Sequence, residues 1–274
     1  MPLLLRATIA IHVIAIALTM ADPSLWPWTL GTIAANHVLL TALSVDPRGS
    51  LLGRNLTRLP PDAIARAQIA VTIDDGPDPE VTPRVLDILD EHGAKATFFC
   101  VGARVEAHPD LAREIVRRGH AIENHSNQHG WHFALSGSGQ FAREITAAQQ
   151  AITSVTGIEP TFFRAPAGMR NPFLDSALRY LGLSLTSWTR RGFDTVERNP
   201  RSVLERLTRG LAAGDILVLH DGNASRTRSG IPVVVEVLPA LLDAIRSAGL
   251  HAVTLRAATG SLPERSRILQ TVAR

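Results

Sequence analysis

Short apolar runs alternate with amphipathic stretches from about residue 68 onward, and a glycine follows each amphipathic stretch. The apolar runs predict strands. In the amphipathic stretches, apolar residues recur about every 3.6 positions, which predicts helices that end at the glycines. We expect strands at 69–74, 96–101, 121–124, 161–164, 184–188, 216–220 and 252–255, and helices at 81–92, 104–118, 141–155, 172–181, 200–213 and 233–248. This alternation predicts an α/β fold with a mainly parallel sheet. Seven strands favour a distorted (β/α)7-type barrel, and an open doubly wound sheet is the alternative.

Polar side chains follow five of the predicted strands at the point where each strand ends. In α/β barrels the reactive groups lie at this C-terminal rim. The set comprises Asp74 and Asp75, then His125 and His129, then Arg164, then Asp194 beyond Trp188, and finally His220. The sequence therefore predicts one site at one end of the barrel.

Asp75, His125 and His129 can form a metal site. Two imidazoles and one carboxylate are a common catalytic zinc set that leaves one position open. Histidines four residues apart lie on one face if the segment turns helically. His132 is a rival ligand, although its spacing from His129 is less suited to a shared face. The expected cofactor is a divalent metal, Zn²⁺, with Co²⁺ or Ni²⁺ as alternatives because the same ligands accept them.

The remaining polar residues of the rim can supply an acid and a base. Successive side chains diverge, so Asp75 can bind the metal while Asp74 accepts a proton from an attacking water molecule. Arg164 could pair with Asp74, or form a surface salt bridge instead. His220 can protonate a departing amine, with Asp194 to orient it, or be a core histidine satisfied by backbone groups.

Five stretches of the chain, in order, resemble the motifs of the NodB-homology polysaccharide deacetylases, carbohydrate esterase family 4. They are Thr72-Ile73-Asp74-Asp75-Gly76-Pro77, His125-Ser126-Asn127-Gln128-His129, Arg164-Ala165-Pro166-Ala167-Gly168, the pair Trp188 and Asp194, and Leu217-Val218-Leu219-His220. The resemblance covers roughly residues 68–256 and leaves residues 1–60 unexplained.

The resemblance implies a distorted (β/α) barrel that hydrolyses N-acetyl groups of amino sugars. It implies the same metal ligands, Asp74 as base, His220 as acid, and Arg164 and Asp194 as their respective partners. The metal and the backbone N–H of Ala167 would bind the oxyanion. As our own hypothesis, separate from the resemblance, Trp188 and Val218 are candidates for the small apolar pocket around the acetyl methyl group.

Three positions depart from the family pattern. Ile73 stands where Phe is usual, Ala167 where many members have Tyr, and Thr195 where many have Trp. The last two departures bear on the binding of long glycans more than on catalysis. The expected substrate is an N-acetylated cell-envelope polysaccharide or a lipid-linked glycan. The alternatives are a deformylase or O-acetyl esterase acting on a lipid-linked sugar, and an idle membrane-tethered glycan-binding module.

Residues 1–46 consist mainly of two apolar runs separated by a turn-forming stretch that contains Trp26 and Trp28. Both runs are close to the lower length limit of a membrane helix, and tryptophans favour the membrane interface. A membrane hairpin is our first interpretation; a signal peptide or single anchor, and soluble helices, are the alternatives. The expected location is the bacterial inner membrane. Arg48, Arg54 and Arg58 favour a cytoplasmic domain, whereas a single anchor would place the domain outside.

After residue 46, we expect a linker at 47–67, the deacetylase domain at 68–256 and a polar tail at 257–274. Charged residues make up only 19% of the chain, below the roughly 25% typical of soluble domains, which agrees with contact to membrane lipid. No dense basic patch with interleaved aromatic residues is present, so nucleic acid is not an expected partner.

Overall fold

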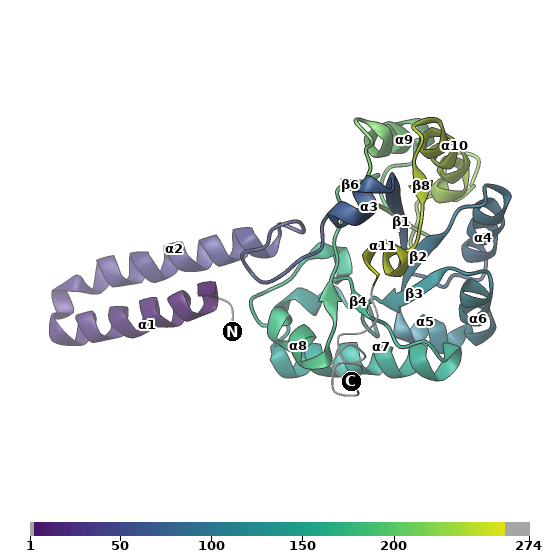
Figure 1. Ribbon diagram of the computed structural model, residues 1–274. Helices are drawn as coiled ribbons and strands as arrows, with labels where there is room; N and C mark the ends of the chain where they lie inside the picture. The colour runs from purple at the N-terminus through teal and green to yellow at the C-terminus, as the bar shows by residue number, and fades with distance from the viewer. Residues whose placement is uncertain (1–2, 261–274) are drawn as a thin grey trace, which may run out of the picture.

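The structure is a computed structural model that describes residues 3–260. A parallel sheet curls into a half-barrel, and helices surround its outer side (Figure 1). The strand order is β5 (Ser184–Leu185), β4 (Phe162–Phe163), β3 (Ala121–Asn124), β2 (Ala96–Cys100), β1 (Gln68–Asp74), β7 (Ile216–His220) and β6 (Arg190–Arg191). A short strand, β8 (His251–Ala252), pairs with the start of β1. The predicted barrel-type fold is confirmed in this open, curled form.

The strand register brings the polar strand ends together. Asp74, at the end of β1, lies opposite Phe99 on β2 and His220 on β7. Asn124, at the end of β3, lies opposite Cys100 on β2 and Phe163 on β4. Since all these pairings are parallel, the residues that follow the strands share one rim of the half-barrel.

Two apolar layers hold the sheet in place. The larger layer fills the space between the sheet and the outer helices, which are α4 (Val81–Glu91), α5 (Gly102–Ala107), α6 (Pro109–Arg117), α9 (Pro200–Thr208) and α10 (Val233–Ser247). The smaller layer fills the concave side and includes Phe99, Trp188 and Val218. Helices α7 (Ser138–Thr156) and α8 (Leu174–Leu181) pack over a third cluster around Phe141 and Phe163.

Several predicted elements have different bounds in the structure. The single helix expected at 104–118 is divided at His108, whose φ of −131° is not helical, since the residue before a proline disfavours the α region. The strand expected at 252–255 is only β8, because Thr254 caps the short helix α11 (Leu255–Thr259). Strand β5 stops at Leu185, and the carbonyl groups of the next two residues accept hydrogen bonds from Arg164 instead.

The segment expected to be a linker, 47–67, is packed onto the domain. Leu52, Leu59 and Ala63 are buried, and α3 (Pro61–Ala65) contacts β1. Leu56 also forms an isolated parallel bridge with Thr186. Apolar side chains at these positions explain why the segment is held rather than free. At the other end, α11 extends into the expected tail, of which residues 261–274 lie outside the described residues.

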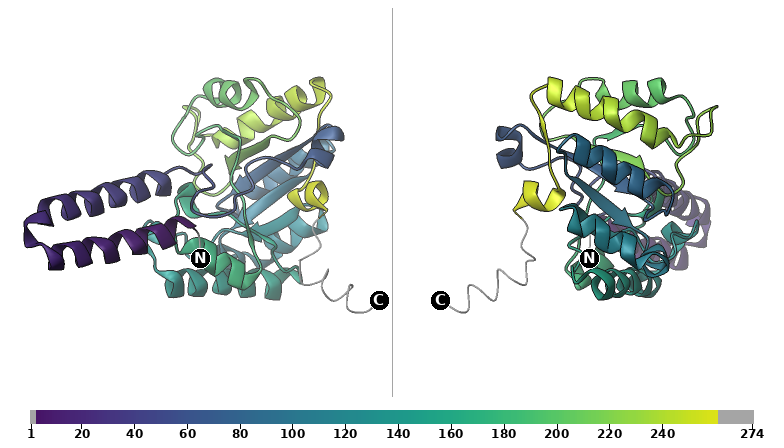
Figure 2. Two further views of the ribbon diagram at one scale, coloured as in Figure 1. Left: turned by 60° about the vertical axis from the view of Figure 1, so that its left-hand side comes forward. Right: turned by 90° about the vertical axis from the view of Figure 1, so that its right-hand side faces the viewer.

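The N-terminal residues form two helices that lie side by side and project away from the half-barrel (Figures 1 and 2). They are α1 (Leu3–Ala21) and α2 (Trp26–Ser44), joined by the 3-10 turn η1 (Pro23–Leu25). By length and composition, α1 could cross a membrane, although a signal sequence would pass the same test. The membrane placement of this hairpin stays a prediction.

Candidate active site

Asp75, His125 and His129 converge at the rim of the half-barrel. The Asp75 Oδ1 atom lies 3.1 Å from His125 Nε2 and 3.0 Å from His129 Nε2. The helical turn considered for the segment from His125 to His129 is not present. His129 reaches the cluster through a left-handed backbone with φ of 52°. One potential ligand atom from each residue lies within 4.8 Å of the others, so these three residues could hold a metal ion.

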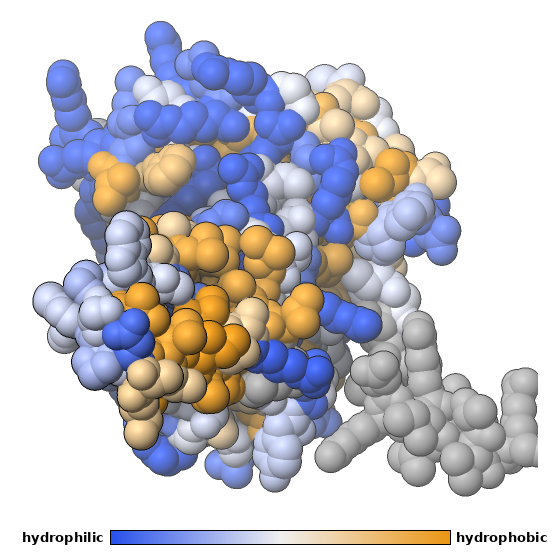
Figure 3. All heavy atoms as spheres, turned by 90° about the vertical axis from the view of Figure 1, so that its left-hand side faces the viewer, coloured by the Kyte–Doolittle hydropathy of each residue, from blue (hydrophilic) through white to orange (hydrophobic). Residues whose placement is uncertain are grey.

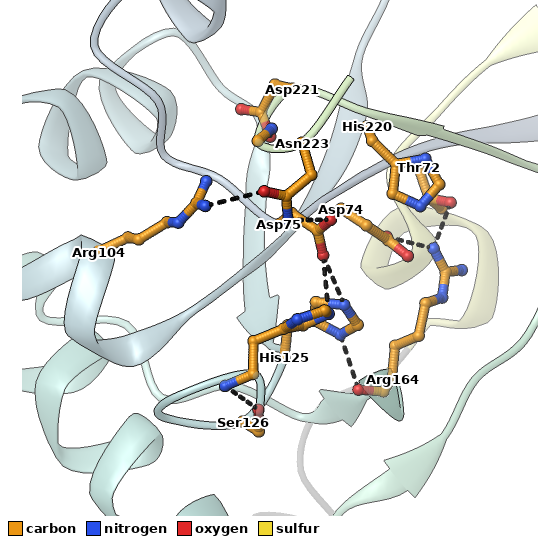
Figure 4. A network of polar contacts seen from close by, with 12 residues as sticks. Thr72, Asp74, Asp75, Arg104, His125, Ser126, Arg164, His220, Asp221 and Asn223 are labelled. Atoms are coloured by element: carbon orange, nitrogen blue, oxygen red, sulfur yellow. Dashed lines mark hydrogen bonds and ion pairs between the residues drawn. The ribbon is translucent and has the colours of Figure 1, made fainter. Parts of the chain in front are cut away.

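Hydrogen bonds fix the orientation of this cluster (Figure 4). The His125 Nδ1 atom lies 2.8 Å from the Arg164 carbonyl oxygen, which directs Nε2 toward Asp75. The Ser126 hydroxyl accepts the His129 backbone N–H at 3.1 Å. Burial raises the pKa of Asp75, but the two imidazoles lower it more, and the net result is well below the usual range. The carboxylate is therefore anionic, as a metal ligand must be.

Asp74 forms a buried ion pair with Arg164. The Arg164 Nη1 atom lies 2.6 Å from Asp74 Oδ1 and donates a second hydrogen bond, of 2.7 Å, to the Thr72 hydroxyl. The guanidinium group also lies 4.1 Å from the centre of the Phe99 ring. Both charged side chains are almost fully buried, so the alternative of a surface salt bridge does not apply. The pair holds one Asp74 oxygen in a fixed position.

His220 and Asp194 form a second buried couple. The His220 Nδ1 atom lies 2.9 Å from Asp194 Oδ1, and the His220 backbone N–H donates to the other carboxylate oxygen at 2.7 Å. Burial lowers the pKa of His220, but the Asp194 carboxylate, with smaller contributions from Asp74 and Asp75, raises it to about 9. The imidazole is therefore cationic at neutral pH.

These groups meet at a cavity of about 230 Å³. Its walls contain Asp74, Asp75, His125, His129, Ala167, Gly168, Trp188, Arg191, Thr195, His220 and Asn223. Ala167 reaches it with a left-handed backbone, φ 55°. Most of the predicted site residues thus line one cavity, and Arg164 and Asp194 lie behind its walls.

Two residues that the sequence offered for the site, one valine and one histidine, lie elsewhere. Val218 is buried in the concave apolar layer and is not in the cavity wall, because the strand leaves only its last residue, His220, at the rim. His132 does not join the metal cluster; its ring packs against Trp131 with centroids 5.6 Å apart. This position agrees with the expectation that His132 is less suited than His129 as a metal ligand.

Our sequence reasoning missed Asn223 and Arg191. Asn223 follows β7, and its side-chain amide donates a hydrogen bond of 2.9 Å to Asp75 Oδ2. Arg191 lies between the rings of Trp188 and Phe193, with distances of 5.3 and 5.2 Å to their centres. The only signal available was that both residues follow or flank predicted strands near the rim.

Known proteins are similar to this chain in sequence and in fold. A model of the polysaccharide deacetylase family matches residues 64–186. The chain is 33% identical over 175 residues to a peptidoglycan-N-acetylglucosamine deacetylase of Bacillus cereus, covering 63% of this chain and 81% of that protein. It is 31% identical over 195 residues to a peptidoglycan-N-acetylglucosamine deacetylase of Listeria monocytogenes, covering 71% of this chain and 39% of that longer protein.

Among solved structures, a family 4 carbohydrate esterase from Streptomyces lividans in complex with acetate is similar. The TM-score is 0.62 and the identity 27%, over 72% of this chain and 98% of that chain. The family model includes Asp74, Asp75, His125, His129 and Arg164, whereas Asp194 and His220 lie beyond the residues that it matches.

Proposed function

The chain belongs to the polysaccharide deacetylase family, whose members hydrolyse non-peptide carbon–nitrogen bonds, and we propose that it removes N-acetyl groups from the amino sugars of a cell-envelope glycan. The observation that carries this proposal is the cavity, where three possible ligands of one metal ion lie beside two acid–base couples. These couples are Asp74 with Arg164 and His220 with Asp194. A binding module would have no use for both couples.

Asp75, His125 and His129 would hold the divalent metal on which deacetylases of this family depend. One anionic carboxylate and two imidazole nitrogens match the donor set of catalytic zinc, and we propose Zn²⁺, with Co²⁺ or Ni²⁺ also fitting these ligands. When bound there, the ion supplies Lewis acidity to the acetamide carbonyl and to the attacking water.

Asp74 is the proposed general base. Its carboxylate lines the cavity beside the metal cluster, while Arg164 holds one of its oxygens from behind. The base would accept a proton from the water molecule that attacks the acetyl carbonyl carbon. Arg164 acts as a positioning residue, because it touches Asp74 and is itself not in the cavity wall.

His220 is the proposed general acid. Since Asp194 occupies its Nδ1 side and keeps the ring cationic, the Nε2–H is left to donate a proton to the departing amine. The Ala167 backbone N–H would stabilise the developing oxyanion, and Trp188 would form the apolar wall beside the acetyl methyl group. Acetate and the free amino sugar are the products.

We further propose that the N-terminal hairpin anchors the enzyme in the inner membrane of a bacterium. Its two helices, the apolar composition of α1 and the tryptophans at its turn support this placement. Arg48, Arg54 and Arg58 follow α2 and favour a cytoplasmic domain by the positive-inside rule. Reporter fusions at the C-terminus would test this orientation.

Acetate release from N-acetylated chitooligosaccharides and peptidoglycan fragments tests the function. Asp74→Asn and His220→Ala should each lower the rate by about 10²-fold or more, the typical contribution of general acid or base catalysis. The exposed substitution Arg201→Ala on α9 serves as the control. Release of formate, or of acetate from O-acetyl esters alone, would show a different acyl specificity. Full activity of folded His220→Ala on every substrate would refute its role as the acid.

A further inference from the structure

Several polar side chains of the hairpin pair with one another between its two helices. The Thr8 hydroxyl donates to Asn36 Oδ1 at 3.3 Å, and the Thr19 and Thr29 hydroxyl groups lie 2.8 Å apart across the two helices. Many of the large apolar side chains are exposed instead: Ile9, Val13, Ile14, Ile16, Leu18, Leu30, Val38 and Leu39. Figure 3 shows apolar side chains over the hairpin, on the part of that face nearest the viewer.

This arrangement is the reverse of a hairpin that is stable in water, and it fits a lipid surround, where polar groups pair between helices. It also explains why α2, which carries Asn36 and His37, is less apolar as a sequence than α1. Each helix has 19 residues, a length of about 28 Å, close to the thickness of a bilayer core. Trp26 and Trp28 are exposed at the turn, where they would meet the far interface.

The near end of the hairpin is built into the rim of the catalytic cavity. The Arg170 backbone N–H donates a hydrogen bond of 3.1 Å to the carbonyl oxygen of Ser44, the last residue of α2. Pro47 packs so closely against Gly168 that a Cβ atom there would lie 2.7 Å from Pro47 Cβ and 2.5 Å from Trp188 Cη2. Gly168 and Trp188 both line the cavity. The cavity therefore has a fixed position relative to the end of α2.

Exposed apolar side chains flank the same part of the rim. The Asn171 side chain donates to the carbonyl oxygens of Ala134 and Ser136 at 2.9 and 2.8 Å, so the loop after His129 lies beside residues 170 and 171. Trp131 and Leu135 in this loop are 86% and 79% exposed. We call these two residues the apolar rim pair. Arg48 and Arg54, also exposed beside α2, suit anionic lipid headgroups.

From these contacts we propose that the hairpin and the apolar rim pair hold the mouth of the catalytic cavity at a bilayer surface, and that the substrate is an N-acetylated amino sugar carried on a membrane lipid. This inference rests on the proposed deacetylation and specifies its substrate class. Confining enzyme and substrate to one surface raises their effective concentration without any new contact.

The experiment uses the full chain in phospholipid vesicles and measures acetate release from three substrates. The first is N-acetylglucosamine linked to a long isoprenoid chain in the same vesicles, the second is its methyl glycoside, and the third is a soluble chitooligosaccharide. We expect the lipid-linked sugar to react about 10²-fold faster than the methyl glycoside at equal total concentration, the lower end of what such tethering supplies.

The variant Trp131→Ser/Leu135→Ser should slow the lipid-linked reaction several-fold and leave the methyl glycoside rate unchanged, which also shows that the variant is folded. Val196→Ser, which is 73% exposed on the loop after β6, is the matched control and should change neither rate. Equal rates on the lipid-linked sugar and the methyl glycoside, or preference for the chitooligosaccharide, would overturn this inference and leave the proposed function intact. No acetate from any of the three would overturn the proposed function.

Discussion

Asn223 holds the oxygen of Asp75 that the two histidines leave free. Its side-chain amide donates to Asp75 Oδ2 at 2.9 Å, while Oδ1 faces the imidazoles (Figure 4). The Arg104 guanidinium in turn donates to Asn223 Oδ1 at 3.3 Å. Gly222 makes this approach possible, since a Cβ atom at that position would collide with the Arg104 guanidinium. Three chain segments thus fix one carboxylate.

Replacing Asn223 with Ala should weaken metal binding by about 10-fold to 100-fold, the usual effect of removing a hydrogen bond that orients a metal ligand. Chelator competition with Zn²⁺ measures the affinity without any assay of activity. Asn199→Ala removes an amide of the same size at the start of α9 and should leave the affinity unchanged. Equal affinity in the Asn223 and Asn199 variants would show that Asp75 needs no such support.

Replacing Asp194 with Asn should move the alkaline limit of activity to lower pH. A general acid must be protonated, so activity falls as the pH rises through the pKa of His220, which is about 9. Without that carboxylate, burial is opposed only by the weaker effects of Asp74 and Asp75, so the pKa of His220 falls. The pH dependence of kcat measures the shift, and Asp243→Asn on α10 is the control. An unmoved alkaline limit would separate His220 from proton donation.

Replacing Arg164 with Met should lower the free energy of unfolding by about 3–5 kcal/mol, because the buried Asp74 carboxylate loses its ion-pair partner. Denaturant titration of the full chain in detergent, followed by tryptophan fluorescence, measures the change. The double variant Arg164→Met/Asp74→Asn should recover part of the loss, since no buried charge remains unpaired. Arg226→Met, which breaks an exposed pair with Glu80, is the control and should have little effect. A loss that the double variant does not recover would point to packing instead.

The sequence was most informative where strand ends carry polar residues. The ends of β1, β3 and β7 were predicted to the residue, and parallel pairing brings Asp74, His125 and His220 to one rim. Helix ends marked by glycine were also close, except that α9 ends at Thr208 and not at residue 213. Local patterns of this kind depend on neighbours in the chain, so they can be recognised without coordinates.

Contacts that involve no polar strand end or family motif could not be predicted from the sequence. Asn223 contacts Asp75 although the two residues are 148 positions apart in the sequence. The contact depends on a left-handed backbone at Asn223, with φ of 76°, which no sequence pattern predicted. Val218 has the correct alternation for the site but lies one layer too deep, because periodicity gives the face of a strand and not its depth. The packing of residues 47–67 similarly depends on contacts such as that of Leu59 with the apolar cluster that contains Phe99 and Trp188, which lie far along the chain.

Removing the metal should abolish acetate release, and restoring it should also stabilise the fold. A ligand that binds only the folded state adds about 2.7 kcal/mol at a free concentration of one hundred times its Kd. Zn²⁺ added to chelator-treated protein should therefore raise the Tm, which differential scanning fluorimetry or calorimetry in detergent would measure. His129→Ala removes one ligand of the cluster and should lose most of this rise, whereas His251→Ala, an exposed histidine on β8, should retain it. An equal rise in all three proteins would place the ion elsewhere than on Asp75, His125 and His129, and the proposed base and acid would then have no activated carbonyl between them.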